Sequence, residues 1–212
     1  MQKKDLERIH IVNHLVNRDK KLGKFIKFFE KENFIIQDDY KKKSEFLSLV
    51  RIIIGQQLSI SAASSIYERF TDRFGDAIET LSINKDSEKS LIELGLSKTK
   101  MNTILELSNL INNKKLDLSL VSHLKEEEAK KILCEIKGIG PWTVENFLLF
   151  SGGNKDICPA NDLGVKKGIQ KIYKLDELPS DEDVYRFSEK WRPYRSIAVR
   201  YIWEIVDQNI SF

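Results

Sequence analysis

Two short segments of the sequence contain residues whose types and spacing could do chemistry. The first, IKGIGPWTV, covers residues 136–144, and the second, ICPANDLGVKKG, places a single acid, Asp162, at the start of an expected helix. Gly138 and Gly140 allow the chain to reverse its direction, and Pro141 already has the φ of a first helical turn. This spacing predicts a helix-hairpin-helix, whose second helix would present unpaired backbone amides to one phosphate of a nucleic acid.

An acid just downstream of such a hairpin indicates chemistry as well as binding. Cleavage of the bond between a base and its sugar develops positive charge on the sugar, and a nearby ionised carboxylate stabilises that charge, activates water or attacks directly. Asp162 is the candidate for this role. The alternative is that Asp162 only caps the helix 163–170, a frequent use of aspartate. Both roles are compatible, because a helix dipole favours negative charge at this position.

The chain resembles the helix-hairpin-helix (HhH-GPD) DNA glycosylases, and within them the alkylation-repair branch called 3-methyladenine DNA glycosylase II. Four ordered blocks carry the resemblance: EFLSLVRIIIGQQLSISAASSIYERF (45–70), LGLSKTKMNTILELS (94–108), the hairpin, and WRPYRSIAVRYIWE (191–204). A hairpin alone would be weak support, because many non-catalytic DNA-binding proteins contain one, whereas four blocks in order are specific. Only roughly the first forty residues lie outside the resemblance.

We expect an all-α fold. Apolar residues recur at helical spacing in several stretches, and no sustained alternation typical of strands is present. The resemblance implies two helical lobes with a central active-site cleft that holds an extruded base. One lobe is contiguous, residues 44–152, and ends in the helix-hairpin-helix at about 130–150. The second lobe combines residues 1–43 with 153–212 and carries Asp162.

The composition is that of an ordinary globular protein. Its 212 residues are 41% hydrophobic and 32% charged, and the net charge is only +3, so a DNA-binding surface must be a local patch. No apolar run reaches membrane-spanning length and the N-terminus lacks a signal peptide, so we expect a cytoplasmic protein that joins the nucleoid through DNA, without a membrane partner. Cys134 and Cys158 lack metal-binding spacing and are interpreted as reduced, buried thiols.

Several residues are candidates for binding the DNA backbone. They are Lys137, Gly138, Gly140, Trp142, Thr143, Lys166 and Arg195. Lys137 could instead be an exposed lysine without a role, and Arg195 could equally pair with a carboxylate inside the interface between the lobes. The resemblance also implies a monovalent cation, Na⁺ or K⁺, bound at the hairpin together with DNA through the backbone carbonyls of Cys134, Ile136 and Gly138. No cofactor is expected to be required.

The resemblance further assigns a wedge and a base pocket. Gln57 would fill the space that the extruded base leaves, although Gly-Gln-Gln is by itself typical of a polar turn. Trp142, Trp203, Asn146 and Leu163 would line the pocket. An indole face attracts the positive charge of an alkylated purine by roughly 0.5–2 kcal/mol. Better-known bacterial members have tyrosines at the positions of Asn146 and Leu163, which predicts a less aromatic pocket here.

Trp142 also bears on the type of reaction. Bifunctional members that nick the strand use a lysine at this position as a Schiff-base nucleophile, and tryptophan cannot form an imine. We therefore predict a monofunctional glycosylase that flips a 3-methyladenine or 7-methylguanine out of double-stranded DNA and hydrolyses its N-glycosidic bond. We expect a monomer. Three alternatives remain: a glycosylase for hypoxanthine or an oxidised or mismatched base, a non-catalytic DNA-binding protein, and a lyase that uses another amine.

Overall fold

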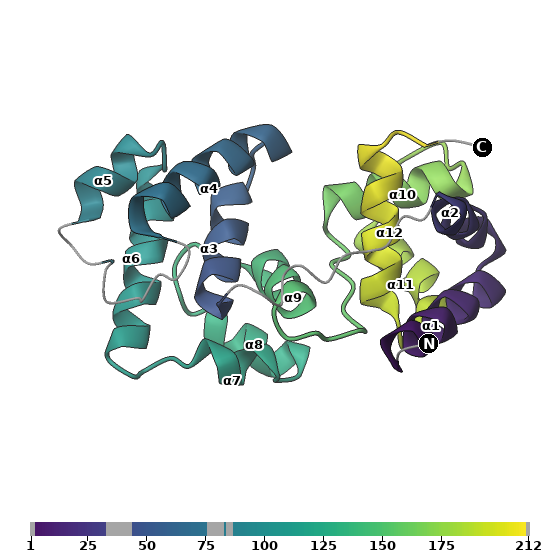
Figure 1. Ribbon diagram of the computed structural model, residues 1–212, viewed down its shortest axis with the longest axis horizontal. Helices are drawn as coiled ribbons and strands as arrows, with labels where there is room; N and C mark the ends of the chain where they lie inside the picture. Colours follow the sequence, from purple (N-terminus) through teal and green to yellow (C-terminus); the bar gives the residue numbers. More distant parts are fainter. Residues whose placement is uncertain (1–2, 33–43, 76–82, 84–86, 211–212) are drawn as a thin grey trace. The chain divides into compact units, whose positions relative to one another are not determined.

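The computed structural model describes residues 3–32, 44–75, 83 and 87–210. All regular secondary structure in these ranges is helical, which confirms the expected all-α fold (Figure 1). None of the described helices is long and apolar enough to cross a membrane. The chain divides into two compact units. Unit 1 combines Met1–Asp38 with Lys155–Phe212, and unit 2 is the contiguous segment Asp39–Asn154.

Most helices of unit 2 begin at a serine or aspartate whose side chain accepts a first-turn amide, as N-cap preferences predict. In chain order they are α3 (Glu45–Gly55), α4 (Ile60–Phe74), α5 (Glu88–Glu93), α6 (Lys98–Asn112), α7 (Leu118–Ser122), α8 (Glu126–Leu133) and α9 (Pro141–Phe150).

Helix α3 forms the centre of unit 2 and packs against α4, α6, α7 and α9 (Figure 1). Five of its apolar residues are fully buried, each with 0% of its surface exposed: Leu47, Leu49, Val50, Ile53 and Ile54. Burial of each such side chain contributes roughly 1.5–3 kcal/mol relative to exposure. The apolar residues of this stretch thus lie at helical spacing on a buried face, and the turn that carries Gln57 follows directly after α3.

Unit 1 is built from two separate stretches of the chain. Its elements are α1 (Lys3–Arg18), α2 (Lys20–Lys31), α10 (Leu163–Tyr173), α11 (Asp181–Ser188), the short 3₁₀ helix η4 (Glu189–Trp191) and α12 (Arg195–Asp207). Helix α12 packs against α10 and α2, and α1 packs against α2 and η4. The N-terminal helices therefore contribute to the core of unit 1. Residues 33–43 lie outside the described part of the chain.

A buried carboxylate, Asp19, joins the two stretches of unit 1. One oxygen caps α2 by accepting the amide of Leu22 at 3.1 Å, and the other accepts Trp191 Nε1 at 2.8 Å and the hydroxyl of Tyr173. Lys190 Nζ lies 3.3 Å from the same oxygen. Burial opposes the negative charge of Asp19, but these donors outweigh it and lower its pKa.

Candidate active site and DNA-binding hairpin

The predicted hairpin is formed by α8, a tight turn and α9. Gly138 has φ +96°, a left-handed conformation that favours glycine, and a Cβ there would lie 2.2 Å from Thr103 Oγ1. Gly140 is the N-cap of α9 with an extended φ of −108°, and Pro141 is the first helical residue. A Cβ at position 140 would meet nothing within 4 Å. The turn therefore requires glycine at 138, whereas glycine at 140 leaves the start of α9 uncovered.

Side chains from outside the hairpin hold its turn in place. Thr103 Oγ1 donates to the carbonyl of Lys137 at 2.8 Å. Gln56 Nε2 donates to the carbonyl of Gly138 at 3.0 Å and to Thr143 Oγ1 at 2.9 Å. Sequence reasoning missed both Gln56 and Thr103, because each contacts the hairpin from a distant part of unit 2. In the sequence, the two consecutive glutamines after α3 were the local feature that could have indicated a contact between this turn and the hairpin.

The hairpin residues predicted to bind DNA differ in exposure. Lys137 and Gly138 are exposed, and Gly140 and Trp142 are half-buried. Thr143 is only 2% exposed; its amide donates to the Gly140 carbonyl at 2.9 Å and its hydroxyl accepts from Gln56. The polar groups of Thr143 thus have partners within unit 2, and its contact with the DNA backbone stays a prediction.

The three carbonyls predicted to bind a monovalent cation lie in the same turn. The carbonyl of Ile136 accepts the Ile139 amide at 3.0 Å, and that of Gly138 accepts Gln56 Nε2. A carbonyl oxygen has two lone pairs, so each of these groups can accept a second partner. The neutral oxygen donors fit a hard cation, and the cation itself stays a prediction.

Two predicted base-pocket residues, Trp142 and Asn146, line an open pocket of about 210 Å³ within unit 2. They lie one turn apart on α9, and Asn146 Nδ2 donates to the Trp142 carbonyl at 2.9 Å. The opposite wall comes from α3, α4 and the turn between them, and includes Arg51, Leu58 and Ala63. The lining thus includes a tryptophan and an arginine, and the guanidinium carbon of Arg51 lies 5.4 Å from the centre of the Tyr67 ring.

The predicted wedge, Gln57, lies at the tip of the turn between α3 and α4. It is exposed and has φ +55°, a left-handed conformation that is uncommon for a residue with a side chain. Leu58 and Ile60 next to it are also exposed. Such a conformation persists only where the surroundings enforce it, and it is common at functional sites.

Asp162 is the N-cap of α10. Its Oδ1 accepts the amide of Val165 at 2.9 Å and the indole Nε1 of Trp203 at 2.9 Å. The residue is 9% exposed, and the following residue, Leu163, is 54% exposed. The capping role weighed for Asp162 is confirmed, and an indole from α12 orients the same carboxylate.

Close approach of α10 and α12 makes the contact between Asp162 and Trp203 possible. A Cβ on Gly164 would lie 2.9 Å from Trp203 Cδ1 and 3.0 Å from Asp162 Oδ1. Asp207 follows Trp203 by one turn of α12. The pKa of its carboxyl is raised, first by partial burial and then by the negative charge of Asp162. The surroundings of Asp162 therefore include a hydrogen-bond donor, the indole of Trp203, and a second acid, Asp207.

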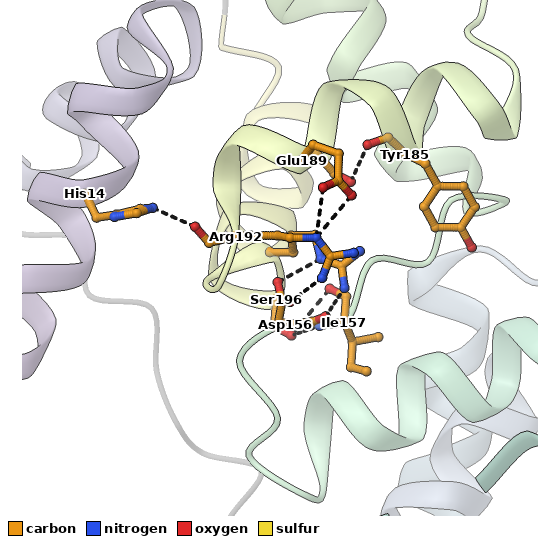
Figure 2. Close-up of polar contacts among 9 residues, drawn as sticks. His14, Asp156, Ile157, Tyr185, Glu189, Arg192 and Ser196 are labelled. Carbon is orange, nitrogen blue, oxygen red and sulfur yellow. Dashed lines mark hydrogen bonds and ion pairs between the residues drawn. The ribbon is translucent and has the colours of Figure 1, made fainter. Parts of the chain in front are cut away.

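Figure 2 shows how ion pairs attach the segment before Asp162 to α12 and η4. Arg195 Nε donates to Asp156 Oδ1 at 2.7 Å, and its guanidinium also donates to the Asp156 carbonyl. Arg192 Nη1 donates to the other carboxylate oxygen of Asp156 at 2.6 Å and pairs with Glu189. The carbonyl of Arg192 accepts from His14 at 2.8 Å when Nε2 carries the proton. These contacts fix the chain six residues before Asp162.

The same segment is also hydrogen bonded to the first turn of α12 (Figure 2). The Ile157 amide donates to Ser196 Oγ at 2.9 Å, and the Ser196 amide donates to the Lys155 carbonyl at 2.9 Å. Helix α12 therefore holds the candidate catalytic segment at two places, through Ser196 at its start and through Trp203 two turns later.

Two basic residues predicted to contact phosphates form ion pairs within unit 1. Arg195 has a carboxylate partner, as the alternative expected, but this partner, Asp156, lies within unit 1; the Arg195 side chain is 8% exposed. Arg195 thus has an internal partner, and its contact with a phosphate stays a prediction. Lys166 Nζ lies 2.6 Å from Asp181 Oδ1, so a phosphate would have to replace that partner.

The two cysteines differ in exposure. Neither forms a disulfide, and Cys158 is buried as expected. The expectation of burial is wrong for Cys134, which is exposed. It lies at the C-terminal end of α8, where the chain leaves the helix and enters the surface turn of the hairpin.

The sequence profile of the HhH-GPD superfamily of base excision DNA repair proteins matches residues 50–193, most of the chain. The protein belongs to this family. YfjP of Bacillus subtilis is 32% identical over 171 residues, which cover 77% of this chain and 60% of that protein's length. DNA-3-methyladenine glycosylase 1 of Schizosaccharomyces pombe is 29% identical over 198 residues, covering 90% of this chain and 84% of the relative.

A solved structure supports the same relationship. The 3-methyladenine DNA glycosylase Mag1 of Schizosaccharomyces pombe, in complex with abasic DNA, superimposes with a TM-score of 0.79 at 26% identity. The match covers 93% of this chain and 97% of that one. This HhH-GPD protein is therefore a base excision repair glycosylase by family, related to the 3-methyladenine glycosylases.

Proposed function

We propose that this HhH-GPD protein is a monofunctional DNA glycosylase that extrudes an alkylated purine, of the 3-methyladenine or 7-methylguanine type, and hydrolyses its N-glycosidic bond. The observation that carries the proposal is the carboxylate of Asp162 at the N-terminus of α10, oriented by the Val165 amide and the Trp203 indole. The names of the relatives support the same substrate class.

In this proposal Asp162 acts by charge. An alkylated purine carries positive charge and leaves readily, so the enzyme gains most by stabilising the cationic sugar that remains. Two donors bind one oxygen of Asp162 and fix the orientation of the carboxylate. A carboxylate held in this way does not have to reorganise as the sugar becomes positive.

The absence of strand cleavage rests on Trp142. This residue stands in the first turn of α9, where the bifunctional relatives have their nucleophilic lysine, and its indole cannot form a Schiff base. Trp142 lines the pocket of unit 2 instead. We infer that it contacts the base and that the product is an intact abasic site.

The hairpin binds one phosphate of the damaged strand in this proposal. Helix α9 has no side-chain cap, and glycine at position 140 leaves the N-terminal, positive end of the helix accessible to an anion. Lys137 is exposed beside the turn and adds positive charge. A Na⁺ or K⁺ ion on the carbonyls of Cys134, Ile136 and Gly138 would add a further positive charge near that phosphate.

One observation favours a second candidate, a glycosylase for a neutral lesion such as hypoxanthine. Arg51 lines the same pocket as Trp142, and a guanidinium opposes entry of a positively charged base. It also donates hydrogen bonds that suit the O6 and N7 acceptors of an unalkylated purine. The two candidates predict opposite orders of substrate preference.

The decisive experiment is release of free bases from DNA treated with a methylating agent, with identification of each released base by mass spectrometry. We expect 3-methyladenine and 7-methylguanine from the wild type. Asp162→Asn keeps a capping residue but removes the charge, and should slow release by at least about 100-fold while DNA affinity changes little.

The alternatives give different results in the same series. Faster release from a hypoxanthine duplex than from methylated DNA would favour the second candidate. DNA binding without release of any base would contradict the enzymatic proposal. Borohydride trapping of the protein on DNA would contradict the assignment as monofunctional, because it requires an imine.

A further inference from the structure

A lysine of α6 binds the end of α3, where the wedge loop (residues 56–59) begins. Lys100 Nζ donates to the carbonyl of Ile54 at 2.8 Å and to the carbonyl of Gln56 at 2.7 Å. Both carbonyls belong to the C-terminal end of α3, where a helix leaves acceptors unpaired and its dipole attracts a cation. Lys100 is thus committed to an internal contact that fixes the backbone immediately before Gln57.

The side chain of Gln56 extends from the same loop to the hairpin. Its amide nitrogen lies 3.0 Å from the Gly138 carbonyl and 2.9 Å from Thr143 Oγ1. Gly138 forms the turn of the hairpin, and Thr143 lies in the first helical turn of α9. A single side chain therefore connects the wedge loop to both parts of the phosphate-binding hairpin.

Helix α6 contacts the hairpin as well as the wedge loop. Thr103 lies one turn after Lys100, and its hydroxyl is within hydrogen-bond distance of the carbonyls of Lys137, 2.8 Å, and of Thr99 in its own helix, 2.9 Å. Thr103 is only 2% exposed. One face of α6 thus supports the wedge loop through Lys100 and the hairpin turn through Thr103.

Burial lowers the pKa of Lys100, so placing an ammonium here is unfavourable unless its contacts compensate. Those contacts are the carbonyls of Ile54 and Gln56. An uncharged side chain of similar length would fill the space without that desolvation cost. Such a side chain could not donate hydrogen bonds to the two carbonyls at the end of α3. The charged lysine therefore serves to fix the position of the wedge loop.

We propose that Gln56, Lys100 and Thr103 form a latch that holds the wedge loop at a fixed distance from the phosphate-binding hairpin, so that backbone binding and base extrusion are coupled. The proposal rests on the proposed function, because it assigns positioning residues to that reaction. Extrusion requires the wedge to enter the duplex while the backbone is held. A wedge loop that moves independently of the hairpin would give way when it meets the base stack.

The test compares excision of 7-methylguanine from duplex and from single-stranded oligonucleotides under single-turnover conditions. Only the duplex requires extrusion against stacking and pairing. Lys100→Met should slow excision from the duplex by about tenfold and change single-strand excision by less than about twofold, because misplacement affects only the extrusion step. A general loss of folded protein would slow both substrates equally. Lys98→Met, at the exposed start of α6, is the matched control and should change neither rate.

Amide hydrogen exchange tests the latch without catalysis. Peptides that cover residues 54–59 should exchange faster in Lys100→Met than in the wild type or in Lys98→Met. Gln56→Leu, which leaves Lys100 in place, is the second variant and should shift the ratio of duplex to single-strand rates in the same direction. It also keeps the test informative if Lys100→Met does not fold.

The outcomes separate the latch from the proposed function. If the wild type excises 7-methylguanine but both variants keep the wild-type ratio of duplex to single-strand rates, the latch is overturned. If the wild type excises nothing from either substrate, the proposed function fails. The exchange experiment then decides the latch alone, and unchanged exchange at residues 54–59 overturns it.

Discussion

Two helix N-termini of this protein are built in opposite ways. The N-cap of helix α9 is Gly140, which has no side chain to cap the first turn and no neighbour within 4 Å of where a Cβ would stand. The N-cap of helix α10 is Asp162, whose Oδ1 accepts hydrogen bonds from the Val165 amide and the Trp203 indole. Both termini offer the positive end of a helix dipole, but only the second has its own anion.

The difference shows how one structural device can serve two purposes. At α9 the positive end of the helix is available to an anion from outside, which suits a phosphate. At α10 the positive end is occupied by a carboxylate of the protein, so that a negative charge is held in place for a cationic partner. The helix end that is open to an external phosphate thus serves binding, and the helix end that is capped by the protein's own carboxylate serves the chemistry.

The largest expected effect separates the charge of Asp162 from its capping role. Asp162→Asn and Asp162→Ala should both slow base release by at least about 100-fold, because each removes the carboxylate. Only the alanine variant should also lose stability, by about 1 kcal/mol, since asparagine caps helices as well as aspartate does. Urea denaturation of the two variants measures this difference. Appreciable base release by either variant would contradict the charge assignment.

An intermediate effect is expected when the start of α9 is made to resemble that of α10. Gly140→Asp places a carboxylate at the open N-cap, where no neighbour obstructs it and φ is extended. It should weaken binding to undamaged duplex DNA by about tenfold at low salt, through repulsion of the phosphate. Gly140→Asn has nearly the same size without the charge and is the control. Fluorescence anisotropy at several salt concentrations measures both; equal affinities would show that no phosphate binds at this helix start.

The smallest effect concerns the donor that orients Asp162. Trp203→Phe keeps an aromatic ring beside Gly164 but removes the indole N–H that donates to Oδ1 at 2.9 Å. Loss of one such bond is worth roughly 1.5 kcal/mol, which predicts a decrease in kcat of about tenfold or less. DNA affinity should not change. An unchanged kcat would indicate that the Val165 amide alone is sufficient to orient the carboxylate.

Local features of the site were predictable because they follow from backbone chemistry over a few residues. Gly138, Gly140 and Pro141 predict the hairpin, since a left-handed glycine and a fixed proline φ determine the turn whatever surrounds it. The cap at Asp162 is equally local, because the carboxylate and the Val165 amide are three residues apart. The helical spacing of α3 predicted its buried face for the same reason.

Contacts between distant residues could not be obtained in this way. Gln56 is 82 residues from Gly138, and Trp203 is 41 residues from Asp162. Arg195 illustrates the limit, because the sequence permits either a phosphate or a carboxylate partner. In the structure its side chain pairs with the carboxylate of Asp156. The burial predicted for Cys134 was wrong, because the residue type alone does not show that this cysteine lies at a helix end on the protein surface.

The sequence by itself therefore determined the all-helical class, the hairpin, the acid at a helix start and the family to which they belong. Tertiary structure alone decided which side chains support them: the indole on Asp162, the glutamine on the hairpin turn and the lysine at the end of α3. The physical reason is that dihedral preferences and helix caps act over three or four residues, whereas a hydrogen bond between distant residues exists only after packing has brought its donor and acceptor within about 3 Å.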